Sequence, residues 1–265
     1  MNSRLDIYLV EKGITESRER AKALIMAGLI YVNGVKAEKA GEKIPENAEI
    51  EVRGNTLLYV SRGGLKLEKA ISSFEIDIKD KICMDIGAST GGFTDCMLQN
   101  GARKVYAVDV GYGQLAWKLR NDNRVICMER TNIRNVTTES LPEKIEFFSV
   151  DVSFISLIHI FPVIKEIATE VCQGVALIKP QFEAGKENVG KKGVVKDVDV
   201  HVSVIVKCVE IATANGFFVN GIDFSPVKGP EGNIEFLMLF SSNPSKEIIT
   251  EEIIQFIVKS AHESL

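Results

Sequence analysis

The first 58 residues carry a hydrophobic pattern that changes from helical to strand spacing. Leu5 and Leu9, four residues apart, predict a short amphipathic helix, and apolar positions over residues 21–28 predict a second one. Alternation around Asn33-Gly34 predicts a β-hairpin, because both residues accept the positive φ that a tight turn needs. Residues 48–52 predict a further strand. We therefore expect a small α+β domain over residues 1–58.

From residue 59 onward, predicted strands and helices alternate. Strands separated by helices imply a parallel sheet, whereas the last two strands are joined too closely for a helical crossover and must be antiparallel. We therefore expect a mostly parallel α/β domain over residues 59–265, after a linker at 53–58. The predicted strands are 82–85, 105–109, 125–128, 145–151, 174–178, 217–224 and 234–240, and the main helices are 65–74, 93–100 and 200–215.

A glycine-rich turn follows the first predicted strand of this domain, and the second strand ends in an acid. Glycines let the backbone approach a nucleoside cofactor, and such an acid can accept hydrogen bonds from ribose hydroxyls. Ser89 stands where a pyrophosphate-binding fingerprint needs its second glycine, which favours S-adenosylmethionine over a dinucleotide. A tight turn that binds no ligand is the alternative. The expected cofactor-binding residues here are Asp85, Gly87, Ala88, Ser89, Thr90, Gly91, Gly92 and Asp109.

Four charged residues are expected at the same edge of the sheet. Asp151 and Lys179 end predicted strands, and Glu235 begins the antiparallel strand. Lys66 lies on the helix before the first strand. Because ligands of open α/β sheets bind beside the carboxyl ends of the strands, we expect the four side chains to converge beside the cofactor, with Lys179 between Asp151 and Glu235. Solvated charges at strand ends are the alternative.

Such a group suits methylation of a ribose 2′-hydroxyl. This hydroxyl is a poor nucleophile, and a lysine held between carboxylates can orient it, stabilise the developing alkoxide and help to move its proton. Other acceptors predict other residues. Amine methylation usually shows an Asp-Pro-Pro-Tyr-like loop, where this chain has Asp151-Val152-Ser153-Phe154, and pyrimidine C5 methylation needs a Pro-Cys pair, which the chain lacks.

Composition narrows the class of protein further. The chain has 265 residues, 45% hydrophobic and 26% charged, which is ordinary for a globular protein. It has no run of 18 apolar residues and no apolar signal-peptide core after Met1, so we expect no membrane span. Five scattered cysteines indicate reduced thiols in a cytoplasmic protein, and three distant histidines argue against a zinc site.

The net charge of −4 is unevenly distributed. Residues 103–134 contain seven basic and three acidic residues, and residues 179–196 contain five lysines and two acids. Positive charge is therefore concentrated in segments that follow the glycine-rich turn. Ordinary solvated charge would also explain either segment alone, so these segments support an RNA partner without requiring one.

The first domain resembles the RNA-binding module of a small-subunit ribosomal protein, which pseudouridine synthases and tyrosyl-tRNA synthetases share. Residues 1–53 contain nine basic and nine acidic residues, so only one helical face can contact phosphates. A helical dimerisation domain is the alternative. The residues that match the module are Arg4, Leu5, Asp6, Leu9, Ser17, Arg18, Ala21, Ile25, Gly28, Val32, Asn33 and Gly34, and the expected RNA contacts are Arg4, Arg18, Arg20 and Lys22.

The whole chain closely resembles the TlyA, or haemolysin A, family of ribosomal RNA 2′-O-methyltransferases. The linker departs from some members, which have Arg-x-Trp-Val where this chain has Leu57-Leu58-Tyr59-Val60. The motifs that carry the resemblance are Val60-Ser61-Arg62-Gly63, residues 87–94, residues 109–117, Glu129-Arg130-Thr131-Asn132, residues 153–157 and Lys179-Pro180-Gln181-Phe182-Glu183.

The resemblance implies a class I, Rossmann-like methyltransferase sheet and a catalytic Lys-Asp-Lys-Glu tetrad at Lys66, Asp151, Lys179 and Glu235. It adds Asn132 as a cofactor contact and Arg62 as an RNA contact. It also implies S-adenosylmethionine as cofactor, ribosomal RNA or ribosomal subunits as partner, and cytidine in 23S and, in some members, 16S rRNA as substrate. No metal and no membrane are expected. A membrane-active haemolysin and a non-catalytic ribosome assembly factor are the alternatives.

Overall fold

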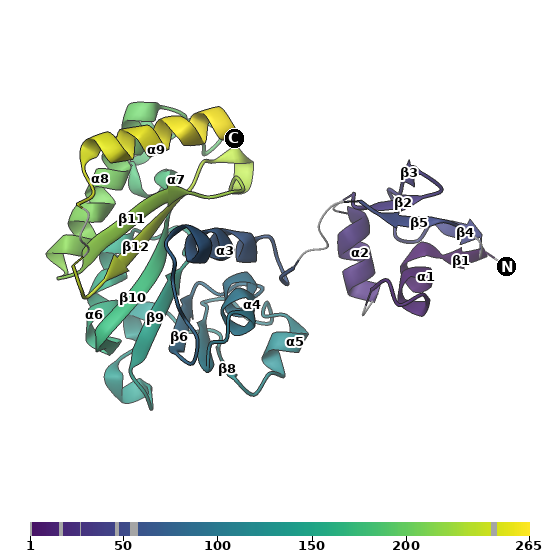
Figure 1. Ribbon diagram of the computed structural model, residues 1–265, viewed down its shortest axis with the longest axis horizontal. Helices are drawn as coiled ribbons and strands as arrows, with labels where there is room; N and C mark the ends of the chain where they lie inside the picture. Colours follow the sequence, from purple (N-terminus) through teal and green to yellow (C-terminus); the bar gives the residue numbers. More distant parts are fainter. Residues whose placement is uncertain (1, 16–17, 27, 46–47, 54–57, 245–247) are drawn as a thin grey trace. The chain divides into compact units, whose positions relative to one another are not determined.

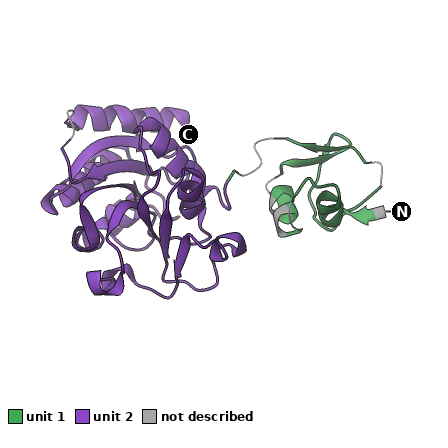
Figure 2. Ribbon diagram, turned by 60° about the horizontal axis from the view of Figure 1, so that its bottom comes forward, with its two compact units in different colours: residues 1–58 green, residues 59–265 purple. Residues whose placement is uncertain are grey.

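The computed structural model describes residues 2–15, 18–26, 28–45, 48–53, 58–244 and 248–265. The protein forms two compact units, Met1–Leu58 and Tyr59–Leu265 (Figure 2). Within the linker expected at 53–58, residues 54–57 lie outside the described part of the chain. Each unit has a hydrophobic core of its own.

The small unit packs two helices against two short antiparallel sheets. Strands β1 and β4 form one sheet, and the order in the other is β3-β2-β5. Leu5, Leu9 and Ile25 are buried in the core, as the helical spacing predicted. Asn33 and Gly34 join β2 to β3 with positive φ. The elements are β1 (Asn2–Arg4), α1 (Leu5–Glu11), α2 (Arg18–Met26), β2 (Ile30–Val32), β3 (Val35–Lys36), β4 (Lys43–Pro45) and β5 (Ile50–Val52).

The large unit is built on a seven-stranded sheet of order β11-β12-β10-β9-β6-β7-β8. Its neighbours pair in parallel except for β12, which is antiparallel to both β10 and β11. This is the mostly parallel α/β sheet predicted from the sequence, with the antiparallel strand inserted second from one edge. The strands are β6 (Ile82–Ile86), β7 (Lys104–Val108), β8 (Val125–Met128), β9 (Ile145–Val150), β10 (Ala168–Ile178), β11 (Phe218–Phe224) and β12 (Phe236–Ser241).

Helices cover both faces of this sheet (Figure 1). Alternate strand residues point to opposite faces, so Met84 belongs to one hydrophobic cluster and its neighbour Cys83 to the other. The helices are α3 (Gly63–Ser73), α4 (Gly92–Gln99), α5 (Trp117–Arg120), α6 (Phe161–Ile167), α7 (Pro180–Glu183), α8 (Val198–Ala214) and α9 (Glu251–Ser264), and the 3₁₀ turns are η1 (Ile133–Asn135), η2 (Thr138–Ser140), η3 (Leu157–His159), η4 (Lys186–Asn188) and η5 (Pro230–Gly232).

Several elements were not anticipated from the sequence. Strand β1 is short and polar, so its residues carry no strand signal, and it exists because it pairs with β4. Helix α6 runs directly into β10, which is six residues longer than predicted and changes register between Ala168 and Gln173. Helix α9 buries Ile254, Val258 and Ala261, a helical spacing that the sequence does contain. In the described part of the chain, no helix combines the length and apolarity needed to cross a membrane.

Candidate active site

A cavity of about 450 Å³ lies at the edge of the sheet where β6, β9 and β10 end and β12 begins. Its size is within the range typical of small-molecule sites. The glycine-rich turn and the four charged residues expected to converge there all contribute to its wall. The lining residues are Ser61, Arg62, Gly63, Lys66, Asp85, Gly87, Ala88, Ser89, Thr90, Gly92, Phe93, Asp151, Ser153, Lys179, Val227, Lys228, Gly229 and Glu235.

Two lysines and two acids form a chain of alternating charges in this cavity. Lys66 Nζ lies 2.6 Å from Glu235 Oε2 and 3.9 Å from Asp151 Oδ2. Lys179 Nζ lies 2.5 Å from Asp151 Oδ1 and donates a hydrogen bond to Ser153 Oγ at 3.1 Å. Asp151 is thus shared by both ammonium groups. The alternation balances the charge of four groups that are otherwise costly to remove from water.

The structure corrects the expected order of the tetrad. Lys66, and not Lys179, lies between Asp151 and Glu235. Lys66 reaches both acids because it comes from α3, which packs against β12. Lys179 follows the last residue of β10 and turns toward Asp151, which follows the last residue of the neighbouring strand β9. Lys179 therefore has one acid and one hydroxyl as partners, and its ammonium group borders the open cavity.

Glu235 is enclosed by the loop before β12. Its side chain is fully buried, and a Cβ atom at Gly229 would lie only 2.1 Å from its Oε1. The backbone amide of Ser225 donates to the Glu235 carbonyl at 2.8 Å. Gly229 thus allows the close approach of backbone to a buried carboxylate, a role that its sequence context did not reveal.

The glycine-rich turn packs directly against the strand that carries Asp151. Gly87 has φ of +86°, and a Cβ atom there would lie 2.4 Å from the backbone oxygen of Asp151. Ser89 also has positive φ, at 49°. The tight turn therefore serves two purposes: it lines the cavity, and it lets β6 and β9 end side by side.

Asp85, in β6, fixes the glycine-rich turn through its hydrogen bonds. Its carboxylate accepts hydrogen bonds from the Thr94 amide at 2.9 Å, the Thr94 hydroxyl at 2.7 Å and the Ser149 hydroxyl at 2.9 Å. Burial raises the pKa of Asp85 to about 6, although these hydrogen bonds act in the opposite direction. Asp85 thus joins the start of α4 to β9, and it also contributes to the cavity wall.

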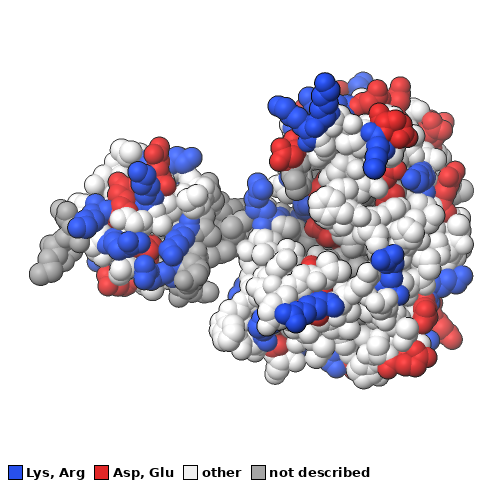
Figure 3. Space-filling model, turned by 180° about the vertical axis from the view of Figure 1, so that it is seen from behind, with Lys and Arg blue, Asp and Glu red and all other residues white. Residues whose placement is uncertain are grey.

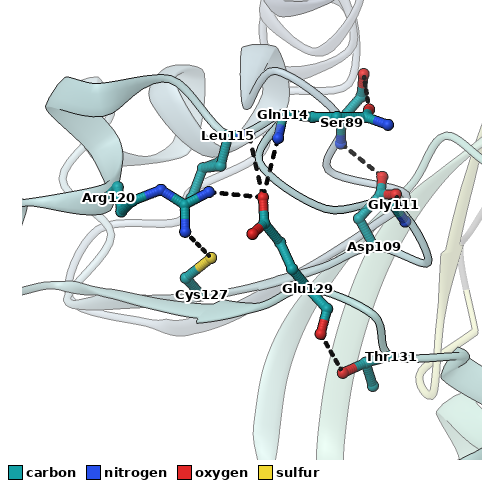
Figure 4. Close-up of polar contacts among 9 residues, drawn as sticks. All are labelled: Ser89, Asp109, Gly111, Gln114, Leu115, Arg120, Cys127, Glu129 and Thr131. Atoms are coloured by element: carbon teal, nitrogen blue, oxygen red, sulfur yellow. Dashed lines mark hydrogen bonds and ion pairs between the residues drawn. The ribbon is translucent and has the colours of Figure 1, made fainter.

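Asp109 stands at the end of β7, and both of its carboxylate oxygens contact the backbone of the surrounding loops. Oδ2 accepts from the Ser89 amide and Oδ1 from the Gly111 amide, each at 2.7 Å (Figure 4). A carboxylate has about four lone-pair sites, so it can still accept from ribose hydroxyls. Asp109 therefore braces the glycine-rich turn, and it is not itself among the residues that line the cavity.

Glu129, at the end of β8, organises the loop that follows Asp109. Its Oε1 accepts hydrogen bonds from the backbone amides of Gln114 and Leu115 and from Arg120 Nη2, which lies 2.6 Å away (Figure 4). Arg120, together with the amide of Gly113, lowers the pKa of Glu129 to about 2. Sequence analysis found Glu129 only as part of a motif and assigned it no role.

Two further predicted site residues lie in different surroundings. Asn132 follows Thr131, whose backbone amide donates to the Asp109 carbonyl at 2.9 Å. The side chain of Asn132 accepts a hydrogen bond from the Arg134 amide. It does not line the cavity described above. Arg62, at the start of α3, is exposed and lines the cavity.

The small unit brings two of the predicted RNA contacts together through a buried acid. Asp6 is fully buried and accepts from Arg4 Nε at 3.0 Å and from Arg18 Nη2 at 2.9 Å. The hydrogen bond from Arg4, and after it the contacts with Arg18, hold the pKa of Asp6 well below its usual range. Both arginine side chains remain about half exposed, and Lys22 is exposed. The side chain of Arg20 lies outside the described part of the chain.

Basic side chains gather on the face of the small unit drawn in Figure 3, with acidic groups among them. This distribution agrees with the balanced charge of the first 53 residues. Positive charge on this unit is thus a property of a local surface and not of the whole domain.

We expect Asp109→Ala to weaken binding of S-adenosylmethionine by about 1.5–3 kcal/mol, the usual loss for a hydrogen bond to a charged group. Isothermal calorimetry with the purified full-length protein measures this. Asp122→Ala is a matched control, because Asp122 is a loop carboxylate whose side chain pairs with Arg124, whereas Asp109 accepts from the Ser89 amide of the glycine-rich turn. Unchanged cofactor affinity in a folded Asp109→Ala protein would refute the placement.

No group of three or more histidine, cysteine, aspartate or glutamate side chains within the described ranges is arranged to hold a metal ion. The described ion pairs of the cavity instead join acids to lysines.

The comparisons with known proteins define the class of the chain. Residues 59–242 match the FtsJ-like methyltransferase family, and residues 3–50 match the S4 domain. The cavity beside the carboxyl ends of a seven-stranded sheet is therefore that of an FtsJ-like methyltransferase, and the small unit is an S4 domain.

The relatives identify the family more closely, and the chain belongs to the TlyA family. It is 40% identical to "16S/23S rRNA (cytidine-2'-O)-methyltransferase TlyA" of Mycobacterium tuberculosis over 89% of this chain and 88% of the relative. It is 52% identical to "Putative rRNA methyltransferase YqxC" of Bacillus subtilis, over 99% and 95%. It is also 46% identical to "Hemolysin A" of Brachyspira hyodysenteriae, over 89% and 99%.

A solved structure agrees over the full length. The chain is similar to "Putative hemolysin from Streptococcus thermophilus", with a TM-score of 0.79, 47% identity, and coverage of 99% of this chain and 96% of that chain. The class of enzyme and the fold predicted from the sequence are thereby confirmed, as is membership of the TlyA family.

Proposed function

We propose that this protein transfers the methyl group of S-adenosylmethionine to the 2′-oxygen of a cytidine in ribosomal RNA. The observation that carries the proposal is the buried Glu235–Lys66–Asp151–Lys179 chain in the same cavity as the glycine-rich turn. The relative from Mycobacterium tuberculosis bears this activity in its name. We take 23S and 16S rRNA as the target molecules from the name of that relative.

The residues present fit S-adenosylmethionine. Most residues of the turn at 87–92 line the cavity, and glycine lets this turn pack tightly, since a Cβ atom at Gly87 would lie 2.4 Å from the backbone oxygen of Asp151. We assign Asp109 to the ribose hydroxyls and Asn132, in the loop after β8, as a further contact. When bound, the cofactor supplies an activated methyl group attached to a sulfonium sulfur.

The protein's own groups prepare the acceptor. We assign Lys179 to the 2′-hydroxyl, which it orients. As the oxygen forms its bond to the methyl carbon, the hydroxyl proton passes to the Lys179 amine, which gives one of its own protons to the Asp151 carboxylate. Asp151 holds Lys179 in place at 2.5 Å, and Ser153 adds a second contact at 3.1 Å. Lys66 and Glu235 extend this chain into the buried part of the site and keep Asp151 in position. Such general acid–base assistance typically contributes about 10²–10⁴ in rate.

Substrate capture is assigned to both units. In the small unit we assign phosphate contacts to Arg4, Arg18, Arg20 and Lys22, and in the large unit to Arg62 at the cavity. The S4 match and the paired arginines on Asp6 support this assignment. Ribosomal subunits in the cytoplasm are then the natural form of the substrate.

The proposal is tested with 30S and 50S subunits from a strain without this activity. The full-length protein and labelled S-adenosylmethionine are expected to place label on rRNA, and mapping is expected to find it on the 2′-oxygen of a cytidine. Label on a base, or no label on either subunit, contradicts the proposal. Lysis of erythrocytes by the same preparation would instead favour the activity in the name of the Brachyspira relative.

A further inference from the structure

Two loops at the rim of the cavity are joined by several contacts, which come from the short segment of residues 179–183. One loop follows β9 and carries Asp151 and Ser153, and the other follows β10 and carries Lys179. Besides the contacts of Lys179 itself, the rings of Phe154 and Phe182 lie 4.9 Å apart. A buried glutamate, Glu183, forms the remaining contacts at the end of α7.

Glu183 spans the gap between the loops with both carboxylate oxygens. Oε2 accepts from the Ser156 hydroxyl at 2.7 Å, and Oε1 accepts from the Leu157 amide at 2.8 Å. The residue is only 5% exposed. Lys207 of α8 lies 3.8 Å from Oε2 and donates to the Glu183 carbonyl at 2.8 Å. A buried acid with this set of partners is oriented firmly.

The loop that Glu183 holds has a backbone that needs support. Phe154, between Ser153 and the Glu183 contacts, has φ of 63°. For a bulky residue this conformation is rare and costs free energy, so it persists only where neighbouring contacts impose it. Because Ser153 directly precedes Phe154, relaxation of Phe154 moves the hydroxyl that accepts from Lys179.

We propose that Glu183 is a positioning residue for methyl transfer, which sets the distance between Asp151 and Lys179 by fixing the loop after β9 to the loop after β10. This proposal rests on the catalytic assignment of Lys179 and Asp151 made above. Glu183 does not line the cavity, so it acts through these residues and not on the substrate. A misplacement of about 1 Å at a reacting centre can lower a rate by about 10²-fold.

The test compares three full-length variants in single-turnover methyl transfer at saturating RNA and cofactor. Glu183→Ala removes both hydrogen bonds and is expected to lower the rate at least about 10-fold, with unchanged cofactor affinity and RNA affinity. Glu183→Gln is expected to restore the rate to within about threefold, because its amide oxygen can accept from Leu157 and its NH₂ group can donate to Ser156. Glu187→Ala, at an exposed glutamate of the nearby turn η4, leaves these contacts in place and is expected to behave like the wild type.

Two further variants, Ser156→Ala and Lys179→Ala, distinguish failure of the positioning role from failure of the catalytic assignment. Ser156→Ala removes the hydrogen bond to Glu183 and the weaker one, at 3.3 Å, that Ser156 accepts from the exposed Ile158 amide. We expect it to slow the reaction several-fold with little change in melting temperature, even if Glu183→Ala folds poorly. Normal rates for both Glu183→Ala and Ser156→Ala, beside an inactive Lys179→Ala, would overturn the positioning role alone. A rate loss in Glu183→Ala that Gln does not rescue, or that Glu187→Ala reproduces, would also overturn it. An active Lys179→Ala would instead contradict the catalytic assignment.

Discussion

Lys179→Ala and Lys179→Arg are both expected to slow methyl transfer to rRNA by roughly 10²-fold or more. Alanine removes the ammonium group that borders the cavity beside Asp151. Arginine keeps the positive charge, but its guanidinium cannot give up a proton at neutral pH. If Lys179 takes part in moving the proton of the 2′-hydroxyl, the charge alone is insufficient. Single-turnover transfer of labelled methyl to ribosomal subunits measures the effect.

The cofactor affinity and the melting temperature of both variants are expected to change little, since Lys179 contacts Asp151 and Ser153 rather than the glycine-rich turn. Lys186→Ala is a matched control, because Lys186 is an exposed lysine of the same loop region. Near-normal turnover by Lys179→Arg would mean that the lysine supplies only charge, and its role in proton transfer would have to be withdrawn.

Removal of residues 1–58 is expected to abolish binding to ribosomal RNA while leaving cofactor binding largely intact. The two units are separate compact bodies with separate cores, and the cavity is lined only by residues of the second unit. Filter binding with rRNA and calorimetry with S-adenosylmethionine measure the two affinities. Full affinity of the truncated protein for a ribosomal subunit would contradict the assignment.

A double substitution in the full-length chain makes the same test without deleting a domain. Arg4→Ala with Arg18→Ala is expected to lower RNA affinity and to reduce its salt dependence by about one unit of slope for each phosphate that the protein no longer neutralises. Lys165→Ala with Lys259→Ala, two exposed lysines on α6 and α9 of the other unit, is the charge-matched control. Equal salt dependence in the double variant and the control would show that the arginine pair on Asp6 does not bind RNA.

Local sequence determined the main elements and the position of the cavity. Apolar runs bounded by turns specify β6, β7, β8 and β9, because a strand buried on both faces needs a continuous apolar segment. The short connection between the last two strands specifies that they are antiparallel. A residue that directly follows a parallel strand must stand at one edge of the sheet, so Asp109, Asp151 and Lys179 could be placed there from the sequence.

The sequence predicted an element less well where that element depends on a partner distant in the chain. Strand β1 has three polar residues and forms because β4 pairs with it. Helical spacing in the sequence predicted α8 but not α6, because α6 is short and continues directly into β10. Propensity and periodicity describe a segment by itself, whereas these segments owe their conformation to tertiary neighbours.

The tertiary structure alone decided which charged groups are partners. The sequence could place Lys66, Asp151, Lys179 and Glu235 at one edge, but side-chain direction puts Lys66, not Lys179, between the two acids. The same holds for Glu183 and Glu129, whose roles depend on backbone amides of other loops. Strand ends are fixed by short-range pattern, whereas the pairing of charged groups depends on how helices and loops pack, and no local pattern encodes that packing.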